Sequence, residues 1–493
     1  MKKVYEIAEK IEGAAIIGDK DAICTSIERD SRKVKEGTLF VAIKGANFDG
    51  HDFLEDAQKK GAVAVLSEND FTPPKGMTLI KVPNLEESLK IIAPFFYDYP
   101  AKSMRVIGIT GTNGKTTTSY LIRRILRENG YKVGLIGTIQ IMIEEEIINT
   151  ANTTPDIVEL QNVLERMKEA NIDYVVMEVS SHALALQRVA GIEFDTAVFT
   201  NLTQDHLDFH KTIENYRAAK AKLFKSLSEN VTKPNKCAVV NIDDAAGDYM
   251  LKAANTKHIT YSIDGDSAIC AKNADIAFEG TNFTLTGDYG TADIKLHLTG
   301  RFNVYNALAA IGACLAENIP LENIKKALAD FTRVHGRFER VGGKNISVIV
   351  DYAHTPDGVE NALKTAREIA KNRVIAVFGC GGDRDKTKRP IMGKIAAKLS
   401  DIVIATSDNP RTENPESILD DVMAGVSENI GNKTVERITD RKTAIYRAVE
   451  LATDGDIVAI LGKGHENYQI LNTGKIHFDD GEVARDALKE YGK

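Results

Sequence analysis

The chain has 493 residues, of which 43% are hydrophobic and 27% are charged, and its formal net charge at pH 7 is −7. This length predicts about three domains, and the composition is typical of a folded globular protein rather than a disordered one. The acidic balance excludes a general electrostatic attraction for nucleic acid or anionic lipid. We therefore expect neither as a partner, and we expect any phosphate to be bound at a local site.

The N-terminus and the cysteines both favour a cytoplasmic protein. The opening residues MKKVYEIAEKIEGA lack the apolar core of a secretory signal, and no apolar run reaches the roughly 18–20 residues that span a bilayer. The five cysteines are far apart and form no C-x-x-C pair, which argues against a zinc or redox site. We expect free thiols that are buried in the core.

The first segment of the chain, 1–102, mixes helical patterns with short apolar runs. Strands are predicted at 39–43, 62–66 and 78–82. We expect a small α/β domain that ends in an exposed linker near Lys102.

The second segment, 103–335, alternates strands with helices. Helices are predicted to begin at Thr116 and Asp156, and strands are predicted at 106–110, 132–138, 174–179, 196–201 and 237–241. Such alternation indicates a mainly parallel sheet with helices on both faces.

The third segment, 336–493, repeats this α/β pattern. Strands are predicted at 347–352, 374–379, 402–406 and 457–461, with helical stretches between them. We therefore predict a separate, Rossmann-like C-terminal domain, and an α/β protein of three domains overall.

The run VIGITGTNGKT at 106–116 is the strongest local signal, because an apolar strand meets glycines and then a helix-forming stretch. Glycines let successive backbone N–H groups point at phosphate oxygens, and the helix N-terminus adds positive potential. Ile109 stands where the usual phosphate-loop spacing has its first glycine. A capped turn is the alternative, but we predict an ATP site made by Thr110, Gly111, Thr112, Asn113, Gly114, Lys115 and Thr116.

Two further predicted strands end in polar side chains. The apolar run 174–179 carries Glu178, and the strand at 196–201 leads to His206. The carboxyl ends of parallel strands meet at one edge of a sheet, where open α/β sheets bind ligands. We expect Glu178 and His206 to lie near the phosphates, where a carboxylate suits Mg²⁺.

At this point the sequence resembles the Mur ligases, ATP-dependent amide-forming enzymes of bacterial peptidoglycan precursor synthesis. Residues 110–116 are similar to the family's own phosphate loop, which tolerates Ile109. The resemblance implies a cytoplasmic, monomeric ligase with ATP and Mg²⁺ as cofactors. It also implies that Thr116, Glu178 and His206 bind the metal and that Lys115, Glu178 and His206 are catalytic.

The segment YRAAK at 216–220 resembles the one that carries the family's carbamylated lysine. The resemblance implies that Lys220 is modified by CO₂ and that the resulting anion is catalytic and holds a second Mg²⁺, which an ammonium could not do. From the residues alone, a solvated helix lysine remains the alternative, because Lys222 and Lys225 lie nearby.

Motifs further along the chain resemble the parts of the family that bind the far side of ATP. By this resemblance Asn303, Arg337, Asp351 and His354 contact the nucleotide from between the central and C-terminal domains, so domain closure completes the site. The alternatives are a helix cap at Asn303 and a strand-end turn at Asp351.

The run DNPR at 408–411 resembles the motif of the family branch that adds meso-2,6-diaminopimelate. Diaminopimelate is lysine with an extra carboxylate, and a guanidinium can donate two parallel hydrogen bonds to that group. A surface salt bridge is the alternative for the arginines. The diaminopimelate site implied by the resemblance comprises Arg384, Asp408, Asn409, Pro410, Arg411, Gly462 and Glu466.

The N-terminal motifs, including DSR at 30–32, resemble the domain that binds the uridine diphosphate of this branch's substrate, a UDP-muramoyl dipeptide. Leu186 stands where the family has a polar residue, so the role of the neighbouring Gln187 is left open. The implied substrate site comprises Ser31, Asn152, Thr153, Thr154, Ser180, Gln187 and Arg188.

The implied reaction joins the D-Glu γ-carboxylate to the diaminopimelate amine through an acyl phosphate. A lysine-adding relative and a folylpolyglutamate synthetase are the alternative ligases, and the DNPR run and the UDP-type domain argue against both. A nucleotide-switch binding protein is the alternative from another class.

Overall fold

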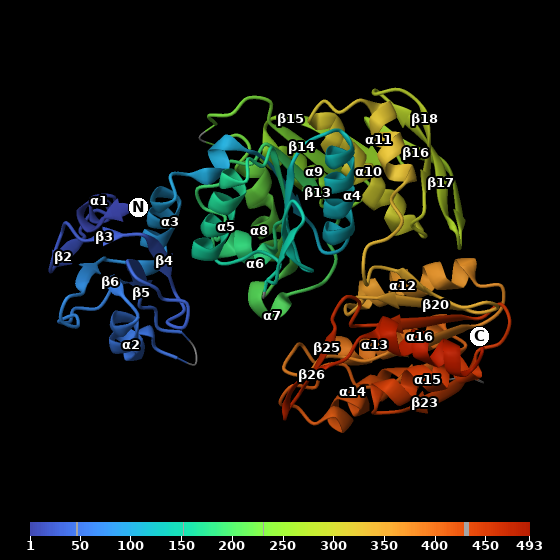
Figure 1. Ribbon diagram of the computed structural model, residues 1–493. Helices are drawn as coiled ribbons and strands as arrows, with labels where there is room; N and C mark the ends of the chain where they lie inside the picture. Colours follow the sequence, from blue (N-terminus) through green and yellow to red (C-terminus); the bar gives the residue numbers. More distant parts are fainter. Residues whose placement is uncertain (46–47, 151, 230, 428–432) are drawn as a thin grey trace.

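The computed structural model describes residues 1–45, 48–150, 152–229, 231–427 and 433–493. Three lobes follow one another along the chain, and each is built around its own β-sheet (Figure 1). The α/β class and the three-domain organisation are confirmed. No helix within the described ranges is both long and apolar enough to cross a membrane.

The N-terminal lobe contains a five-stranded sheet in the order β2-β7-β6-β5-β4, in which only β2 runs antiparallel to its neighbour. The three predicted strands correspond to β5, β6 and β7. The strands are β2 (Ala15–Ile17), β4 (Ser26–Glu28), β5 (Thr38–Val41), β6 (Ala62–Ser67) and β7 (Thr78–Lys81), and the small β1 (Lys2–Lys3) pairs with β3 (Ile23–Cys24). The helices are α1 (Val4–Ala8), η1 (Gly50–Phe53), α2 (Leu54–Lys59) and α3 (Leu85–Phe96).

The segment after α3 differs from the exposed linker that the sequence predicts. Tyr97, Pro100 and Ala101 are buried, and only neighbouring side chains such as Lys102 are exposed. The short helix η2 (Pro100–Ser103) packs against the central lobe, and Ala101 belongs to its apolar core. The prediction was wrong here because the apolar faces of these aromatic and small residues are covered by another domain.

The central lobe holds an eleven-stranded sheet in the order β11-β10-β9-β12-β8-β13-β14-β15-β16-β17-β18, which is parallel from β9 to β16 and antiparallel at both edges. The strands of the parallel part are β8 (Arg105–Thr110), β9 (Val133–Ile136), β12 (Tyr174–Glu178), β13 (Thr196–Phe199), β14 (Cys237–Asn241), β15 (Lys257–Ser262) and β16 (Ile269–Ala277). The middle strands are buried on both faces, as their continuous apolar runs predict.

Helices cover both faces of this sheet. One apolar core packs α4, α10 and α11 on the sheet, and a second core packs α5, α8 and α9 on the opposite face (Figure 1). The helices are α4 (Lys115–Glu128), α5 (Ile157–Glu169), α6 (Ser181–Ala185), α7 (Leu207–His210), α8 (Ile213–Lys225), α9 (Gly247–Ala254), α10 (Arg301–Ala316) and α11 (Leu321–Ala329). Asp156 caps α5 by accepting from the N–H groups of Val158 and Glu159.

The edge strands of the central sheet are absent from the sequence predictions. They are β10 (Ile141–Ile143), β11 (Glu146–Ile148), β17 (Gly280–Gly287) and β18 (Ala292–Leu296). In β18 buried and exposed residues alternate strictly, which is the pattern of a sheet with one solvated face. Strands of this alternating kind have apolar residues only at every second position, so no continuous apolar run indicates them.

The C-terminal lobe holds a six-stranded sheet in the order β19-β20-β24-β21-β22-β23, parallel except for β19. The four predicted strands correspond to β20, β21, β22 and β24. The strands are β19 (Glu339–Gly342), β20 (Ser347–Asp351), β21 (Val374–Phe378), β22 (Ile402–Ala405), β23 (Thr434–Arg437), β24 (Ile457–Leu461), β25 (Tyr468–Leu471) and β26 (Gly474–His477). The last two strands form a separate hairpin.

Helices α12 (Pro356–Ile369), α13 (Lys388–Leu399) and α14 (Pro415–Ser427) cover one face of this sheet, and α15 (Arg441–Leu451) and α16 (Asp480–Glu490) cover the other. Strand β24 enters the sheet between β20 and β21, although it follows both in the sequence. The carboxyl ends of β20, β24, β21 and β22 are therefore neighbours, and ligands of open α/β sheets bind at such an edge. All five cysteines are free and buried, as predicted.

A buried ion cluster fixes the amino ends of the central strands. Asp195, with a fully buried side chain, accepts from the Val106 N–H at 2.7 Å and from the Lys233 ammonium at 2.9 Å. Lys236 lies 3.5 Å from the same carboxylate, and Arg105 lies 3.4 Å from it. The cluster therefore joins β8 to the strand entry at Asp195.

Replacing Asp195 by Ala removes the carboxylate that pairs with Lys233 and accepts from the Val106 N–H, whereas Lys236 keeps Glu193 and Arg105 keeps Glu317. We expect the central domain to lose about 3–5 kcal/mol of unfolding free energy, the usual result of breaking a buried ion pair from one side. Urea denaturation followed by circular dichroism measures the loss. Asp266→Ala, at an exposed carboxylate of the same domain, is the control and should change the midpoint little.

Candidate active site

The phosphate loop follows β8 and leads directly into α4. Gly111 has φ +152° and Gly114 has φ +88°. A Cβ atom on Gly111 would lie 1.8 Å from the Thr200 hydroxyl, and one on Gly114 would lie 2.3 Å from the Asn306 amide oxygen. Only glycine fits these two positions, so the loop packs tightly on the end of β13 and on α10.

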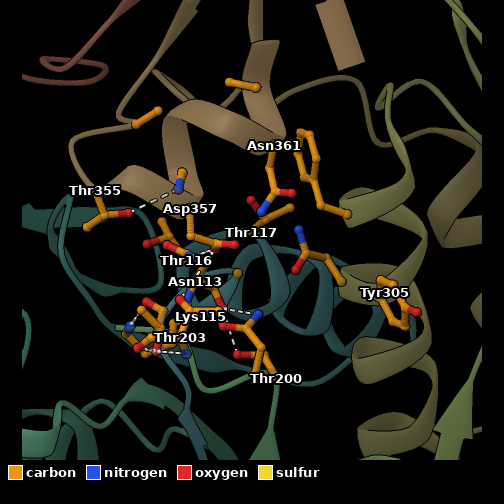
Figure 2. Close-up of a pocket in the computed structure, with 18 of the residues that line it drawn as sticks. Asn113, Lys115, Thr116, Thr117, Thr200, Thr203, Tyr305, Thr355, Asp357 and Asn361 are labelled. Carbon is orange, nitrogen blue, oxygen red and sulfur yellow. Dashed lines mark hydrogen bonds between the residues drawn. The ribbon is translucent and has the colours of Figure 1, made fainter. Parts of the chain in front are cut away.

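Lys115 begins α4, and its side chain bends back over the loop. Its ammonium donates to the carbonyls of Gly111 and Thr112, both at 2.8 Å. Burial lowers the pKa of this ammonium, and the carboxylates of Glu178 and Asp205 oppose that effect. Figure 2 shows Lys115 and Thr116 facing the pocket from below, opposite residues of α12. A cation at a helix N-terminus is placed to meet phosphate oxygens.

The fully buried carboxylate of Glu178 lies beside this loop at the end of β12. It accepts from the Thr116 hydroxyl at 3.0 Å, from the Thr138 hydroxyl at 3.0 Å and from the Thr138 N–H at 2.9 Å. Asn201, which follows β13, accepts from the Asn113 N–H at 2.9 Å through its amide oxygen. The strand ends thus bring together oxygen atoms of the kind that hard cations prefer.

His206 lies in the pocket beside the phosphate loop, close to the end of β13, where the sequence predicts it. Its Nε2 lies 3.4 Å from Asp205, and its ring centroid lies 4.7 Å from that of His182. Burial lowers the pKa of His206 to about 4. The imidazole is therefore neutral at pH 7, the form that can bind a metal.

Lys220 lies on α8, and only 1% of its surface is exposed, whereas Lys222 and Lys225 are exposed. Its ammonium donates to the Gly111 carbonyl at 2.7 Å, next to the phosphate loop. Burial and the nearby Lys115 hold the pKa of Lys220 well below its usual range. The alternative of a solvated helix lysine is wrong, because the side chain is enclosed at the nucleotide site.

A cavity of about 610 Å³ lies between the central and C-terminal lobes, lined by the phosphate loop, Glu178, Asp205 and His206 on one side. Arg337, Asp351 and His354 line its other side. The Arg337 guanidinium donates to the Thr116 hydroxyl at 3.1 Å and stacks on Tyr352 at 4.5 Å. One side chain of the C-terminal lobe therefore reaches the phosphate loop.

A second contact joins the same two lobes. The Asn113 amide donates to Asp357, in the first turn of α12, at 2.5 Å, and the Thr203 hydroxyl donates to the same oxygen at 3.4 Å (Figure 2). Asp357 was not predicted as a site residue. The only sequence signal for it was its place three residues after His354, in the same motif.

Asn303 is not among the residues that line the cavity. It is 2% exposed, and its amide donates to the Thr299 carbonyl at 2.9 Å and accepts from Asn306 at 3.0 Å. Asn306, one helical turn further on, lines the cavity instead. In this structure Asn303 therefore holds Asn306, which lines the cavity.

Residues predicted to hold the peptide part of the substrate gather at the end of β12. The Thr154 hydroxyl donates to the Glu178 carbonyl at 2.8 Å, and Arg188 donates to the Thr154 carbonyl at 3.1 Å. Thr153 lines the cavity and lies 3.0 Å from Thr138, oxygen to oxygen. Ser180 caps α6 by accepting from the Ala183 N–H at 3.1 Å.

The remaining predicted substrate residues lie apart from this group. Ser31 is on the N-terminal lobe. An ion pair of 3.5 Å between Arg29 and Asp156 connects this lobe to the start of α5. Asn152 and Gln187 are exposed, and Gln187 has φ +53°. A ligand that reached from Ser31 to Thr153 would have to span the junction of two lobes.

A second group of polar side chains lies at the carboxyl ends of β22 and β24. Asp408 and Asn409 are buried after β22, and Gly462 and Glu466 follow β24. The Asn409 amide donates to Glu466 at 2.8 Å. Gly462 has φ +118°, and a Cβ there would lie 2.5 Å from the Asp408 carboxylate. The predicted residues of this motif are thus brought together.

Arg411 and Arg384 lie at the rim of this group. Arg411, with φ +54°, donates to the Gly382 carbonyl at 2.7 Å and is held by its own N–H to the Ile470 carbonyl at 3.0 Å. A Cβ on Gly381 would lie 2.9 Å from the Arg411 guanidinium, so glycine makes room for it. Arg384 is exposed and donates to the Asp383 carbonyl at 2.9 Å. Pro410 precedes Arg411 and is buried.

The chain is similar in sequence to known proteins in each of its three lobes. Family models match in three places: the Mur ligase family catalytic domain at 24–97, the Mur ligase middle domain at 109–314 and the Mur ligase glutamate ligase domain at 336–464. A protein of Bacillus cereus named UDP-N-acetylmuramoyl-L-alanyl-D-glutamate–2,6-diaminopimelate ligase is 47% identical over 99% of this chain and 98% of its own length.

Solved structures give the same picture of the fold. A structure of a UDP-N-acetylmuramoyl-L-alanyl-D-glutamate–2,6-diaminopimelate ligase is 34% identical, with a TM-score of 0.68 over 100% of this chain and 99% of that one. MurF ligase from Thermotoga maritima, solved with ADP, is 18% identical, with a TM-score of 0.67 over 96% of this chain and 99% of its own. At 18% identity, the similarity to the Thermotoga maritima enzyme shows a shared fold and nothing further.

A phosphate loop that faces a second α/β domain across a polar cavity is an arrangement suited to binding a nucleotide between two domains. The chain belongs to the Mur ligase family. It is accordingly an enzyme that uses ATP to form an amide bond.

Proposed function

We propose that this enzyme joins meso-2,6-diaminopimelate to the D-Glu γ-carboxylate of UDP-N-acetylmuramoyl-L-alanyl-D-glutamate, while ATP is converted to ADP and phosphate. The observation that carries the proposal is the 47% identity, over nearly the whole chain, to a relative named for this pair of substrates. The arginine in the run 408–411, held at the carboxyl edge of the C-terminal sheet, supports the same amino acid.

The first half of the proposed reaction occurs at the phosphate loop. The γ-carboxylate attacks the γ-phosphorus of ATP, which gives an acyl phosphate and ADP. Lys115 and the N–H groups at the start of α4 would stabilise the charge on the transferred group, and Arg337 lies within reach of the same side. Thr153, Thr154, Ser180 and Arg188 would hold the peptide beside this site.

The residues around Glu178 fit a magnesium ion. Among the residues with described positions, no group of three or more His, Cys, Asp or Glu side chains forms a metal cage by itself. A single carboxylate with a hydroxyl beside it suits Mg²⁺, which often completes its shell with water and nucleotide phosphates. When bound, Mg²⁺ would neutralise charge on the phosphates. Glu178, Thr116 and His206 would hold it, and the carbamate of Lys220 would hold a second Mg²⁺.

In the second half the diaminopimelate amine attacks the acyl carbon and phosphate leaves. The group around Asp408, Asn409 and Glu466 would bind the amino acid, and Arg411 and Arg384 would pair with the carboxylate that lysine lacks. We further propose that the enzyme acts as a cytoplasmic monomer on these small molecules, with domains at 1–102, 103–335 and 336–493.

Arg411→Ala tests the choice of amino acid. Removing one partner of a buried charge pair costs about 3–5 kcal/mol, and a partly exposed pocket softens that cost, so kcat/KM for diaminopimelate should fall by roughly 10²–10³. Use of L-lysine should fall far less. Arg447→Ala, at a surface arginine of α15, is the matched control. Equal losses for both amino acids would mean that Arg411 is structural.

Release of ADP tests the ligase function against a nucleotide switch. We expect turnover of ATP to require both the UDP-muramoyl dipeptide and diaminopimelate, because phosphate leaves only when the amine attacks. A coupled assay that omits each substrate in turn measures this requirement. Turnover that does not depend on the amino acid would contradict the proposal.

A further inference from the structure

Lys463 is a fully buried lysine that no step of the proposed reaction uses. It lies two residues after β24, between Gly462 and Gly464, whose φ angles are +118° and +52°. Its ammonium lies 3.0 Å from the Asn409 amide oxygen, 3.2 Å from Glu466 and 4.0 Å from Asp408. Burying an ammonium costs hydration free energy unless the group is paired and hydrogen-bonded, and these three neighbours supply that pairing.

The hydrogen bonds of Asn409 show what this lysine determines. The Asn409 amide oxygen accepts from the Lys463 ammonium and from the Ile470 N–H at 2.9 Å. Because both neighbours are donors only, the side-chain amide cannot flip, and its NH₂ group must point toward Glu466, to which it donates at 2.8 Å. The ammonium donates to that same oxygen of Glu466.

Charge balance leads to the same conclusion. Asp408 and Glu466 are both largely buried, with side-chain exposures of 9% and 14%. Arg441, the next cation behind them, is hydrogen-bonded to buried Asp480 at 2.8 and 2.6 Å. Lys463 is therefore the cation that hydrogen-bonds Glu466, and without it the two carboxylates would keep only the more distant charge of Arg441.

We infer that Lys463 is a positioning residue for the amino-acid substrate: it fixes the Asn409 amide and the Glu466 carboxylate in the orientation that receives the substrate's charged α-carbon groups. The inference rests on the proposed function for the identity of that amino acid. Lys463 is not among the residues that line the nucleotide cavity, so formation of the acyl phosphate should not depend on it.

The two halves of the reaction can be measured separately. Formation of the acyl phosphate is reversible, so labelled ADP enters ATP when enzyme, UDP-muramoyl dipeptide and ATP are present without amino acid. Complete ligation is measured in the same preparation with diaminopimelate. The test compares Lys463→Met and Lys463→Gln with Lys442→Met, a control at an exposed lysine on α15.

For Lys463→Met we expect the KM for diaminopimelate to rise by about 10- to 100-fold, as for other losses of an orienting partner, while the exchange rate and the KM for ATP stay within about twofold of wild type. Because Lys463 acts through Asn409 as well as Glu466, the double variant Lys463→Met/Asn409→Ala should lose clearly less than the sum of the two single losses. Lys442→Met should match wild type in both assays.

Two results would overturn the inference. In the first, exchange and ligation fall together in both Lys463 variants, or neither variant folds. Lys463 would then stabilise the domain and would not position the substrate. It has no role in the pocket if the KM for diaminopimelate is unchanged. If the wild-type enzyme ligates a different amino acid, the proposed substrate is wrong, but the same comparison with that amino acid still tests Lys463.

Discussion

Lys220→Ala is expected to lower the rate of ligation by about 10³-fold, because a metal-bound charge in the transition state is worth several kcal/mol and this lysine would supply one of its ligands. In the proposed carbamylation the lysine adds CO₂, which forms a bond between Nζ and carbon and releases a proton. Only the neutral amine can do so. Burial and Lys115 lower the pKa of Lys220, which favours that neutral form.

The modification has its own signature. Short carboxylates such as formate or acetate should restore part of the activity of Lys220→Ala, because they place an anion where the carbamate stood. Lys222→Ala, at an exposed lysine on the same helix, is the matched control and should behave like wild type. Full activity of Lys220→Ala without added carboxylate would refute the role.

Lys115→Met is expected to reduce ATP turnover by roughly 10²–10³, the usual cost of removing one charged donor from a developing oxyanion. The Lys115 ammonium hydrogen-bonds the loop carbonyls of both Gly111 and Thr112, so it lies at the phosphate loop. Binding of the UDP-muramoyl dipeptide should change little, because Ser31 lies on the N-terminal lobe and the hydrogen bonds described for the Lys115 ammonium go to the loop carbonyls of Gly111 and Thr112. Calorimetry with each ligand measures both affinities.

Lys132→Met replaces an exposed lysine just after α4 and serves as the control for this substitution. Equal loss of nucleotide and dipeptide affinity in Lys115→Met would show that the lysine organises both sites, and the assignment of the ligands to separate surfaces would fail.

The parts of the site that could be predicted depend on local backbone chemistry. The phosphate loop was recognisable because glycines, a lysine and a threonine follow an apolar strand, and the structure shows why Gly111 and Gly114 are required there. Glu178 could be placed because a strand end determines where its side chain lies. The Mur ligase resemblance drew attention to Lys220, whose burial no local pattern indicates.

The parts that could not be predicted depend on contacts between distant segments. Asn303 and Asn306 lie one turn apart on the same face of α10, and Asn306 lines the cavity because it is the one that packs against Gly114 of the phosphate loop. Asp357 meets Asn113 only after two lobes come together. Lys463 lies in a motif that was recognised, but its burial follows from the insertion of β24 between β20 and β21.

The fold itself follows a similar division. Strands buried on both faces, such as β8 and β12, are continuous apolar runs and were predicted almost to their ends. The antiparallel edge strands β17 and β18 have one solvated face and were missed. The segment 97–103 was predicted to be exposed because it contains several polar residues. Tyr97 and Ala101 are nevertheless buried, because they pack between two lobes.

The central claim is that the enzyme joins diaminopimelate to a UDP-muramoyl dipeptide. The most direct measurement incubates the wild-type protein with ATP, Mg²⁺, UDP-N-acetylmuramoyl-L-alanyl-D-glutamate and an equimolar mixture of meso-diaminopimelate and L-lysine, and identifies the product by mass. We predict the dipeptide substrate plus one diaminopimelate residue, with one ADP per product. A product that carries lysine in comparable amount, or ADP without any amide product, would contradict the claim.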